Sequence, residues 1–336
     1  MKHMSKCRLA TFIPLGGADD VWRRPGGALM QKIVITGGTG FVGRNVCERL
    51  FAQDSEARLV VPSRRRSNGR ALQVLPTVDL LPCNLHDPAA LPGLLAGADA
   101  LVHLVAILHG SDADFDRVHV QLPRQLAAAC GAAGVKRVVH VSALGAAANA
   151  PSAYLRSKAA GEAAWQAAAQ QHGFGLTLLR PSVIFGAEDR FTNLFAGVQR
   201  LLPVLPLAGA SARFQPVWVG DVAQAVVQAL AAPRAPGPII ECAGPEVLTL
   251  QQIVQQVGEM AGCRRPVLPL PEGLGLLQAA LMGLLPGEPL MSRDNLLSMR
   301  VPNIASGQFP GLDSLGIHPA ALATLAGHFQ PADPRR

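Results

Sequence analysis

Short β-branched runs alternate with alanine-rich stretches of helical length from Lys32 onward. The runs are continuously apolar, as in Val138-Val139 and Leu101-Val102, which is typical of parallel strands buried on both faces. They predict strands at Lys32–Thr36, Arg58–Val61, Val78–Leu81, Ala100–Leu104, Arg137–Val141 and Leu176–Leu179, and helices near Val42–Ala52, Leu91–Leu95, Phe115–Ala133 and Ala153–His172. This βαβ order predicts an α/β protein with a Rossmann-type doubly wound parallel sheet.

A glycine-rich loop, Thr36-Gly37-Gly38-Thr39-Gly40-Phe41-Val42-Gly43, lies directly between the first predicted strand and the first predicted helix. In a dinucleotide-binding loop, Gly37 would permit a tight turn and Gly40 would let backbone N–H groups approach a pyrophosphate. Gly43 would let the helix pack closely on the strand. We therefore expect Gly37, Thr39, Gly40, Phe41, Val42 and Gly43 to bind a dinucleotide. The alternative, an ordinary glycine-rich turn, is disfavoured by the strand and helix on either side.

The end of the second strand indicates which dinucleotide is bound. NAD-selective proteins usually place Asp or Glu there, whereas this chain continues with Ser63, Arg64, Arg65 and Arg66. Arginines can give a 2′-phosphate charge-assisted hydrogen bonds of about 1.5–3 kcal/mol each, so NADP(H) is favoured over NAD(H), with Ser63 and Arg64 as the expected contacts. A solvated basic loop is the alternative. Asn84 is placed to hold the adenine amine, and Leu85, Leu104 and Val105 are further expected contacts at the ends of later strands.

A tyrosine and a lysine four residues apart, Tyr154 and Lys158, form the second motif. Tyr154 is the only tyrosine in the chain, and Lys158 is one of only three lysines after Met30. The i, i+4 spacing places both on one helix face, where the ammonium would lower the pKa of the phenol toward a useful range. Lys158 could also hold the nicotinamide ribose. With Ser142 at a strand end as a hydrogen-bond donor to substrate, the predicted catalytic set is Ser142, Tyr154 and Lys158.

These motifs resemble the short-chain dehydrogenase/reductase superfamily in its extended or atypical branch. The resemblance also rests on Leu179–Gly186 and on Gln215–Ala223. It implies that Pro181 and Ser182 lie beside the nicotinamide and that Asp221 caps a helix returning to the first domain. Val183 is a further expected cofactor contact. Asn84 departs from the aspartate common in that superfamily, which weakens the expected adenine contact.

A narrower resemblance is to bacterial relatives of the NADPH-binding accessory subunit of mitochondrial respiratory complex I. It is carried by Ser152–Glu162, Ile184–Phe191, Ser292-Arg293-Asp294 and Pro310–Ile317. In that family the dinucleotide is thought to be structural, which implies a binding role for this chain without turnover. Respiratory complex I or another membrane-associated complex is then the implied partner.

The rest of the chain sets the domain boundaries and excludes some classes of protein. We expect a dinucleotide-binding domain at residues 31–182 with a return segment at about 213–242. A smaller C-terminal α/β substrate-type domain is expected at 183–212 and 243–330, and residues 1–29 read as a disordered extension or a mis-assigned start. The net charge of +7 comes without stacking aromatics or a recognition helix, so no nucleic acid is expected. No apolar run reaches the roughly 20 residues of a bilayer crossing, and no metal site is expected from the six scattered cysteines.

Two function classes remain open. One is a dinucleotide-binding accessory or assembly protein, in the cytoplasm or peripheral at the inner membrane face. The other is an NADP-dependent oxidoreductase, epimerase or dehydratase acting on a small molecule. The apolar stretch Leu274–Leu285 favours the first class if it docks on a partner. The alternative is that it forms a buried helix of the substrate domain. Arg190 and Arg213 favour the second class if they bind an anionic substrate. The alternative is that both arginines are structural ion-pair partners.

Overall fold

The computed structural model describes residues 30–231, 239–271, 273–277 and 291–329. The expected extension at residues 1–29 and most of the apolar stretch Leu274–Leu285 lie outside these described residues. Among the helices that the structure describes, none combines the length and apolar character that a bilayer crossing requires.

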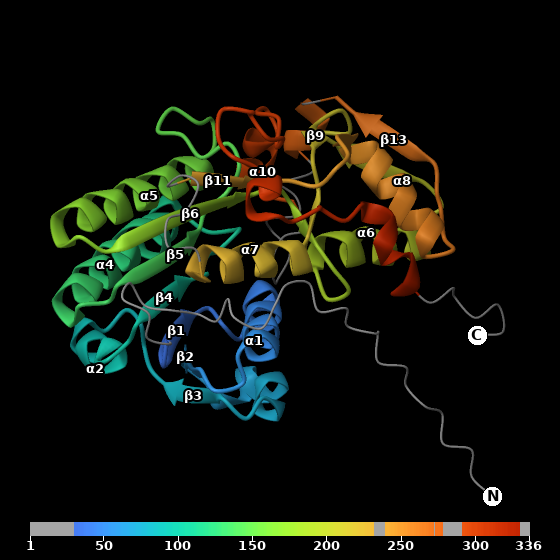
Figure 1. Cartoon of the computed structure of the whole chain (residues 1–336). Helices are drawn as coiled ribbons and strands as arrows, with labels where there is room; N and C mark the ends of the chain where they lie inside the picture. The colour runs from blue at the N-terminus through green and yellow to red at the C-terminus, as the bar shows by residue number, and fades with distance from the viewer. Residues whose placement is uncertain (1–29, 232–238, 272, 278–290, 330–336) are drawn as a thin grey trace, which may run out of the picture.

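A seven-stranded parallel sheet forms the core of the larger part of the molecule, on the left in Figure 1. Its strand order is β11-β6-β5-β4-β1-β2-β3, which is the doubly wound order with the first strand in the middle. The strands are β1 (Lys32–Thr36), β2 (Arg58–Ser63), β3 (Val78–Pro82), β4 (Ala100–His103), β5 (Arg137–Val141), β6 (Gly175–Pro181) and β11 (Ile239–Cys242). The predicted fold class is thus confirmed, with β11 as an additional strand at the edge.

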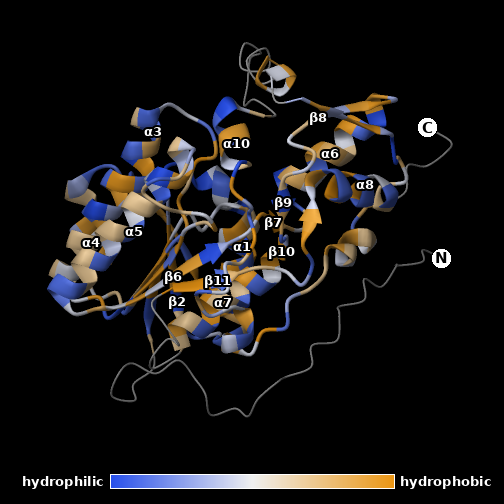
Figure 2. Ribbon diagram, turned by 90° about the horizontal axis from the view of Figure 1, so that it is seen from above, coloured by the Kyte–Doolittle hydropathy of each residue, from blue (hydrophilic) through white to orange (hydrophobic). Residues whose placement is uncertain are grey.

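Helices cover both faces of the sheet. On one face α1 (Phe41–Gln53) contacts α7 (Val219–Ala231), and both bury apolar side chains against β1 and β4. On the other face α4 (Leu122–Ala133) and α5 (Ala153–His172) pack together over β5 and β6, with α2 (Leu91–Leu95) beside them. Figure 2 shows the sheet strands largely in orange, the colour of hydrophobic residues. Blue, hydrophilic positions lie on the outer surfaces of α4 and α5. This two-sided burial explains why the strands are continuously apolar.

The helix predicted at Phe115–Ala133 is three consecutive segments: α3 (Asp112–Asp116), the π-helix η3 (Arg117–Gln121) and α4. It begins earlier than predicted because Ser111 and Asp114 form a capping box at its start. Short 3₁₀ segments, η1 (Arg66–Val74) and η2 (Pro88–Ala90), flank β3.

A smaller cluster of elements follows β6, with its own apolar core. It contains α6 (Arg190–Leu201), α8 (Leu250–Met260), α10 (Arg293–Ser298) and the 3₁₀ segment η5 (Leu322–Gly327). The 3₁₀ segment η4 (Leu312–Leu315) packs instead against α7 and β11, and its Leu312 belongs to the core of the large sheet. Three strand pairs belong to it: β7 (Ile184–Phe185) with β10 (Val217–Trp218), β9 (Arg213–Phe214) with β12 (Leu248–Thr249), and β8 (Leu205–Ala208) with β13 (Val267–Leu270).

Candidate functional site

The glycine loop joins β1 to α1 in a geometry that only glycine satisfies at two positions. Gly37 has a φ of +79°, and a Cβ there would lie 3.0 Å from the carbonyl carbon of Leu104. A Cβ on Gly43 would lie 2.3 Å from the carbonyl oxygen of Gly37. The loop is therefore packed directly on the segment after β4, which contains Leu104 and Val105.

The amino end of α1 is open to an anion. Gly40 is the N-cap residue in an extended conformation, no side chain accepts a hydrogen bond at this cap, and the first turn contains no acidic residue. The first-turn N–H groups, those of Phe41, Val42 and Gly43, have no acceptor within the helix, so they offer a diphosphate both donors and the positive end of the helix dipole. Thr39 lies in the turn just before Gly40. This end of the helix fits the expected pyrophosphate site.

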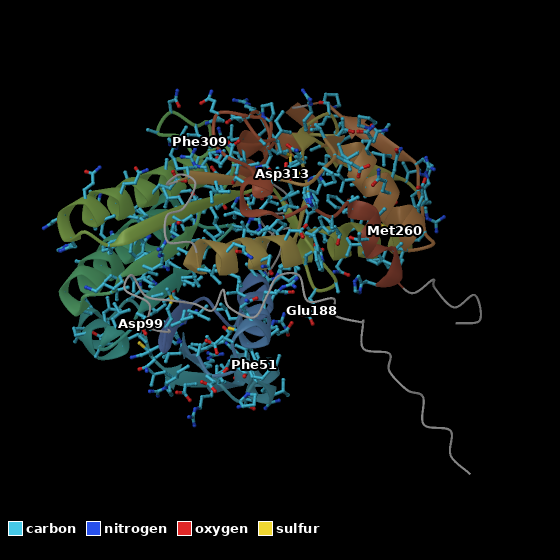
Figure 3. All side chains as sticks on the ribbon, viewed as in Figure 1. Phe51, Asp99, Glu188, Met260, Phe309 and Asp313 are labelled. Carbon is cyan, nitrogen blue, oxygen red and sulfur yellow. The ribbon has the colours of Figure 1, made fainter. Side chains whose placement is uncertain are left out.

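The side chains of α1 anchor the loop to the smaller cluster. The Phe41 ring packs on Gly186, where a Cβ would lie 2.9 Å from it. Arg44 forms an ion pair with Glu188, which Figure 3 shows beside α1. Phe41 therefore contributes its amide to the opening of the helix and uses its ring for packing.

The expected adenosine end lies at the carboxyl ends of β2 and β3. Ser63 is buried and its Oγ donates to the carbonyl of Arg65 at 2.9 Å, whereas Arg64 is exposed. Asn84 is exposed, and its Oδ1 accepts from the amide of His86. Burial, Arg117 and Arg64, in that order, lower the pKa of His86, so both guanidinium groups act on this histidine, and Arg117 is also paired with Asp114. Leu85 packs partly buried against the apolar core.

Tyr154 and Lys158 lie in the first turns of α5. Lys158 is only 2% exposed, and its Nζ donates to the carbonyl of Val141 at 2.8 Å, at the end of β5. Burial lowers the pKa of Lys158 to about 8. Burial raises the pKa of Tyr154 to about 12, which corrects the expected lowering by the ammonium. The reason is that the phenol is itself desolvated, and no hydrogen bond joins these two side chains among the described contacts.

Ser142 follows β5 directly and is 4% exposed. Its amide donates to Leu179 at 2.7 Å, but its Oγ has no hydrogen-bond partner in the part of the chain that the structure describes. A buried hydroxyl without a partner costs free energy, so the site is suited to a ligand that supplies one. Because Lys158 binds the carbonyl of Val141, Ser142 and Lys158 are brought to the same strand end.

The segment at the end of β6 is held by a residue that sequence reasoning missed. The Oγ of Ser182 donates to Asn303 Oδ1 at 2.6 Å, and the amide of Val183 donates to the same oxygen at 3.0 Å. Pro181 is the last residue of β6, and its carbonyl accepts from Leu144. The hydroxyl of Ser182 is thus used to fix the chain. No sequence pattern connects Ser182 to an asparagine 121 residues later.

The remaining candidates lie elsewhere. Arg213 lines a cavity of about 620 Å³ between the β8–β9 and α10 segments. Arg190 begins α6. Asp221 lies in the first turn of α7, where its carboxylate accepts from the amide of Ala320, so it connects α7 to the C-terminal segment. A larger cavity, about 750 Å³, lies beside β2 and β3 and contains no residue of the glycine loop. No cluster of His, Cys, Asp and Glu suited to a metal ion occurs within the described ranges.

Comparisons with known proteins place this geometry in a family. The NAD dependent epimerase/dehydratase family matches residues 33–243. The "NADH dehydrogenase [ubiquinone] 1 alpha subcomplex subunit 9, mitochondrial" of Mus musculus is 31% identical over 86% of this chain and 76% of that subunit. The ceramide reductase of Caulobacter vibrioides is 31% identical over 58% of this chain and 59% of that enzyme.

Solved structures agree on the fold. The UDP-glucuronic acid 4-epimerase of Bacillus cereus, in complex with UDP-glucuronic acid and NAD, superposes with a TM-score of 0.63 at 19% identity. The match covers 85% of this chain and 97% of that one. The resemblance predicted from the glycine loop and the Tyr154-Lys158 pair is confirmed, and the chain belongs to the NAD dependent epimerase/dehydratase family.

Proposed function

We propose that this protein binds NADP(H) as a retained dinucleotide. The observation that carries the proposal is the open amino end of α1, with Gly37 and Gly43 packed so closely that a side chain could not be inserted. The diphosphate would lie on the α1 amides, with the adenosine toward Ser63, Arg64, Asn84 and Leu85. The nicotinamide half would lie toward Leu104, Val105, Ser142, Tyr154, Lys158 and the segment Pro181–Val183. When bound, the dinucleotide can supply or accept a hydride.

The preference for NADP(H) over NAD(H) is part of this proposal. The chain offers no carboxylate at the end of β2, and Arg64 is exposed there. The influence of Arg64 on His86 supports a positive potential in this region. A 2′-phosphate would be attracted to it, whereas a 2′-hydroxyl gains little.

We propose that the protein has an accessory role, in which the dinucleotide is bound but not turned over. The long match to a respiratory NADH dehydrogenase subunit supports this role. So does Tyr154, because a phenol with a pKa near 12 is a poor proton donor or acceptor at neutral pH. The partner we propose is a respiratory NADH dehydrogenase or another membrane-associated complex, with the protein in the cytoplasm or peripheral at the inner membrane face. We also propose the division into a dinucleotide domain, 31–182 with 213–242, and a substrate-type domain, 183–212 and 243–330, which the separate apolar cores support.

A reductase or epimerase is the second candidate. The unpartnered Ser142 hydroxyl favours it, because it is placed to bind a substrate oxygen. The similarity to a ceramide reductase also supports it. In this case Tyr154 would exchange a proton with substrate, and a bound dinucleotide near Lys158 would have to bring its pKa down.

The test begins with mass spectrometry of the ligand released from freshly purified full-length protein. We expect NADP(H) at close to one molecule per chain, and co-migration of the protein with respiratory NADH dehydrogenase on native gels. Tyr154→Phe should leave both results unchanged. Substrate-dependent oxidation of NADPH that Tyr154→Phe abolishes would instead establish the enzyme.

A further inference from the structure

A buried histidine lies next to Tyr154 and belongs to none of the predicted motifs. His119 is in the π-helix η3 and is only 2% exposed. Its ring meets the Tyr154 ring edge-on, with centroids 5.5 Å apart. π-helical turns are rare and occur often at functional sites, so the role of this side chain requires an explanation.

The hydrogen bonds of His119 determine which nitrogen carries the proton. The amide of Ile107 donates to Nε2 at 3.1 Å, so Nε2 is an acceptor and carries no hydrogen. On the other side Nδ1 lies 2.8 Å from Ser157 Oγ, and this hydroxyl donates its single proton to the carbonyl of Tyr154 at 2.7 Å. Ser157 must therefore accept from Nδ1. The imidazole is neutral with its proton on Nδ1, in agreement with burial, which lowers the pKa of His119 to about 3.

The histidine thereby joins two parts of the candidate site. Ile107 belongs to the loop after β4, three residues beyond Leu104. Tyr154 begins α5. The bonds run in one direction, from the amide of Ile107 through His119 and Ser157 to the carbonyl of Tyr154.

The backbone of His119 is fixed as well as its side chain. A Cβ on Gly161 would lie 2.2 Å from the carbonyl oxygen of His119. Helix α5 thus approaches the π-turn as closely as glycine allows. Phe115 stacks on the imidazole with ring centroids 5.6 Å apart and also meets the Tyr154 ring edge-on at 6.1 Å, so the three rings pack against one another. The imidazole is thus held by two ring contacts and by its hydrogen bonds to Ile107 and Ser157.

We propose that His119 is a positioning residue, which through its Nδ1–H tautomer holds the loop after β4 and the start of α5 in register and so sets both dinucleotide affinity and the placement of Tyr154. This inference rests on the proposed function only where dinucleotide affinity is concerned. The tautomer of His119 and the placement of Tyr154 do not depend on whether a dinucleotide binds.

The first test is nuclear magnetic resonance of full-length protein with ¹⁵N-labelled histidine. The signals of His119 are identified by their loss in His119→Gln. We expect the pattern of a neutral ring protonated on Nδ1, unchanged between about pH 6 and pH 8. An Nε2-protonated ring, or a ring that titrates in this range, would overturn the proposal. Neither result depends on whether NADPH binds.

The second test uses two amides that each keep one half of the imidazole. In His119→Gln the side-chain oxygen can take the place of Nε2 and accept from Ile107, but the bond to Ser157 is lost. In His119→Asn the side-chain nitrogen can take the place of Nδ1 and donate to Ser157, but the bond to Ile107 is lost. A structural role without positioning would make the two variants alike.

We expect His119→Asn to weaken NADPH binding about fivefold or more, and His119→Gln to stay within about twofold. Conversely, the ¹³Cζ resonance of Tyr154, the single tyrosine, should shift further in His119→Gln than in His119→Asn, because both variants remove the imidazole ring but only His119→Gln loses the bond to Ser157. Ser157→Ala should shift it as well. Equal effects of the two amides on both measurements would contradict the proposal. If the wild-type protein binds no NADPH, the proposed function fails, and the tyrosine resonance together with the tautomer still decides this inference.

Discussion

Lys158 is a cation that the fold has removed from water. It is almost fully buried, and its ammonium donates to the carbonyl of Val141. The carboxylate of Glu162, which favours the charged form, is already paired with Arg180 through two hydrogen bonds. Desolvation therefore dominates, and the pKa of Lys158 falls to about 8 from 10.5.

This pKa predicts a specific dependence of stability on pH. Between about pH 8 and 10.5 the unfolded state binds more protons at Lys158 than the folded state does, so the free energy of unfolding should rise with pH in this window. The slope reaches at most about 1.4 kcal/mol per pH unit. Denaturant titrations of the dinucleotide-free protein at several pH values measure this slope. Lys158→Met is the control, because the buried cysteines titrate alike in the wild-type protein and in this variant. A difference between the two proteins that does not change with pH would show that Lys158 keeps an ordinary pKa.

At the residue scale, the sequence predicts only those site residues whose scarcity or spacing is unusual. The sole tyrosine and the scarce Lys158 stand out in this way, and the structure places them on one helix. His119 and Asn303 could not be found, because their roles depend on contacts 38 and 121 residues away. The pKa of Tyr154 was misjudged for a related reason, since spacing indicates a neighbouring charge but does not measure burial.

At the element scale, the approach of α5 to the π-helix depends on Gly161. The alanine-rich composition of α5 predicts the helix, but the same composition hides the one glycine that allows close contact. The strand β11 is not predicted from the sequence for a different reason. Its sequence, Ile-Ile-Glu-Cys, is short and contains a charged residue, and the structure explains the charge because Glu241 accepts from both the amide and the hydroxyl of Ser306.

We predict that Gly161→Ala destabilises the protein by about 1–3 kcal/mol or more, although alanine is the better helix former. Its Cβ would lie 2.2 Å from a backbone oxygen, so one of the two helices must shift. Gly197→Ala in α6 is the matched control, because a Cβ there meets nothing within 4 Å, and it should stabilise by up to about 1 kcal/mol. Thermal unfolding measures both. Similar shifts in the same direction would show that the close contact is not rigid.

At the scale of the whole molecule, three carboxylates connect the C-terminal segment to the sheet and its helices. Asp221 accepts from Ala320 and Glu241 from Ser306. Asp294 on α10 accepts from the amides of Ala153 and Tyr154, the first residues of α5. These amides have no acceptor within their own helix, so a carboxylate from a distant segment completes the start of the helix that carries Tyr154.

We predict that Asp294→Ala lowers the free energy of unfolding by about 2 kcal/mol or more, since two charge-assisted hydrogen bonds are lost. Asp112→Ala is the control. It removes an exposed carboxylate from the first turn of α3, and should cost about 1 kcal/mol at most. Denaturant unfolding compares the two. Equal losses would mean that Asp294 acts only through local helix electrostatics.

The central claim, that the loop from Gly37 to Gly43 and the arginines after β2 bind NADP(H), is tested most directly by calorimetric titration of the dinucleotide-free full-length protein. The account predicts one NADPH per chain, bound at least about tenfold more tightly than NADH, which corresponds to about 1.4 kcal/mol. It also predicts that Arg64→Ala narrows this gap by weakening NADPH while NADH is unchanged. Equal affinities for the two dinucleotides, or a preference for NADH, would contradict it.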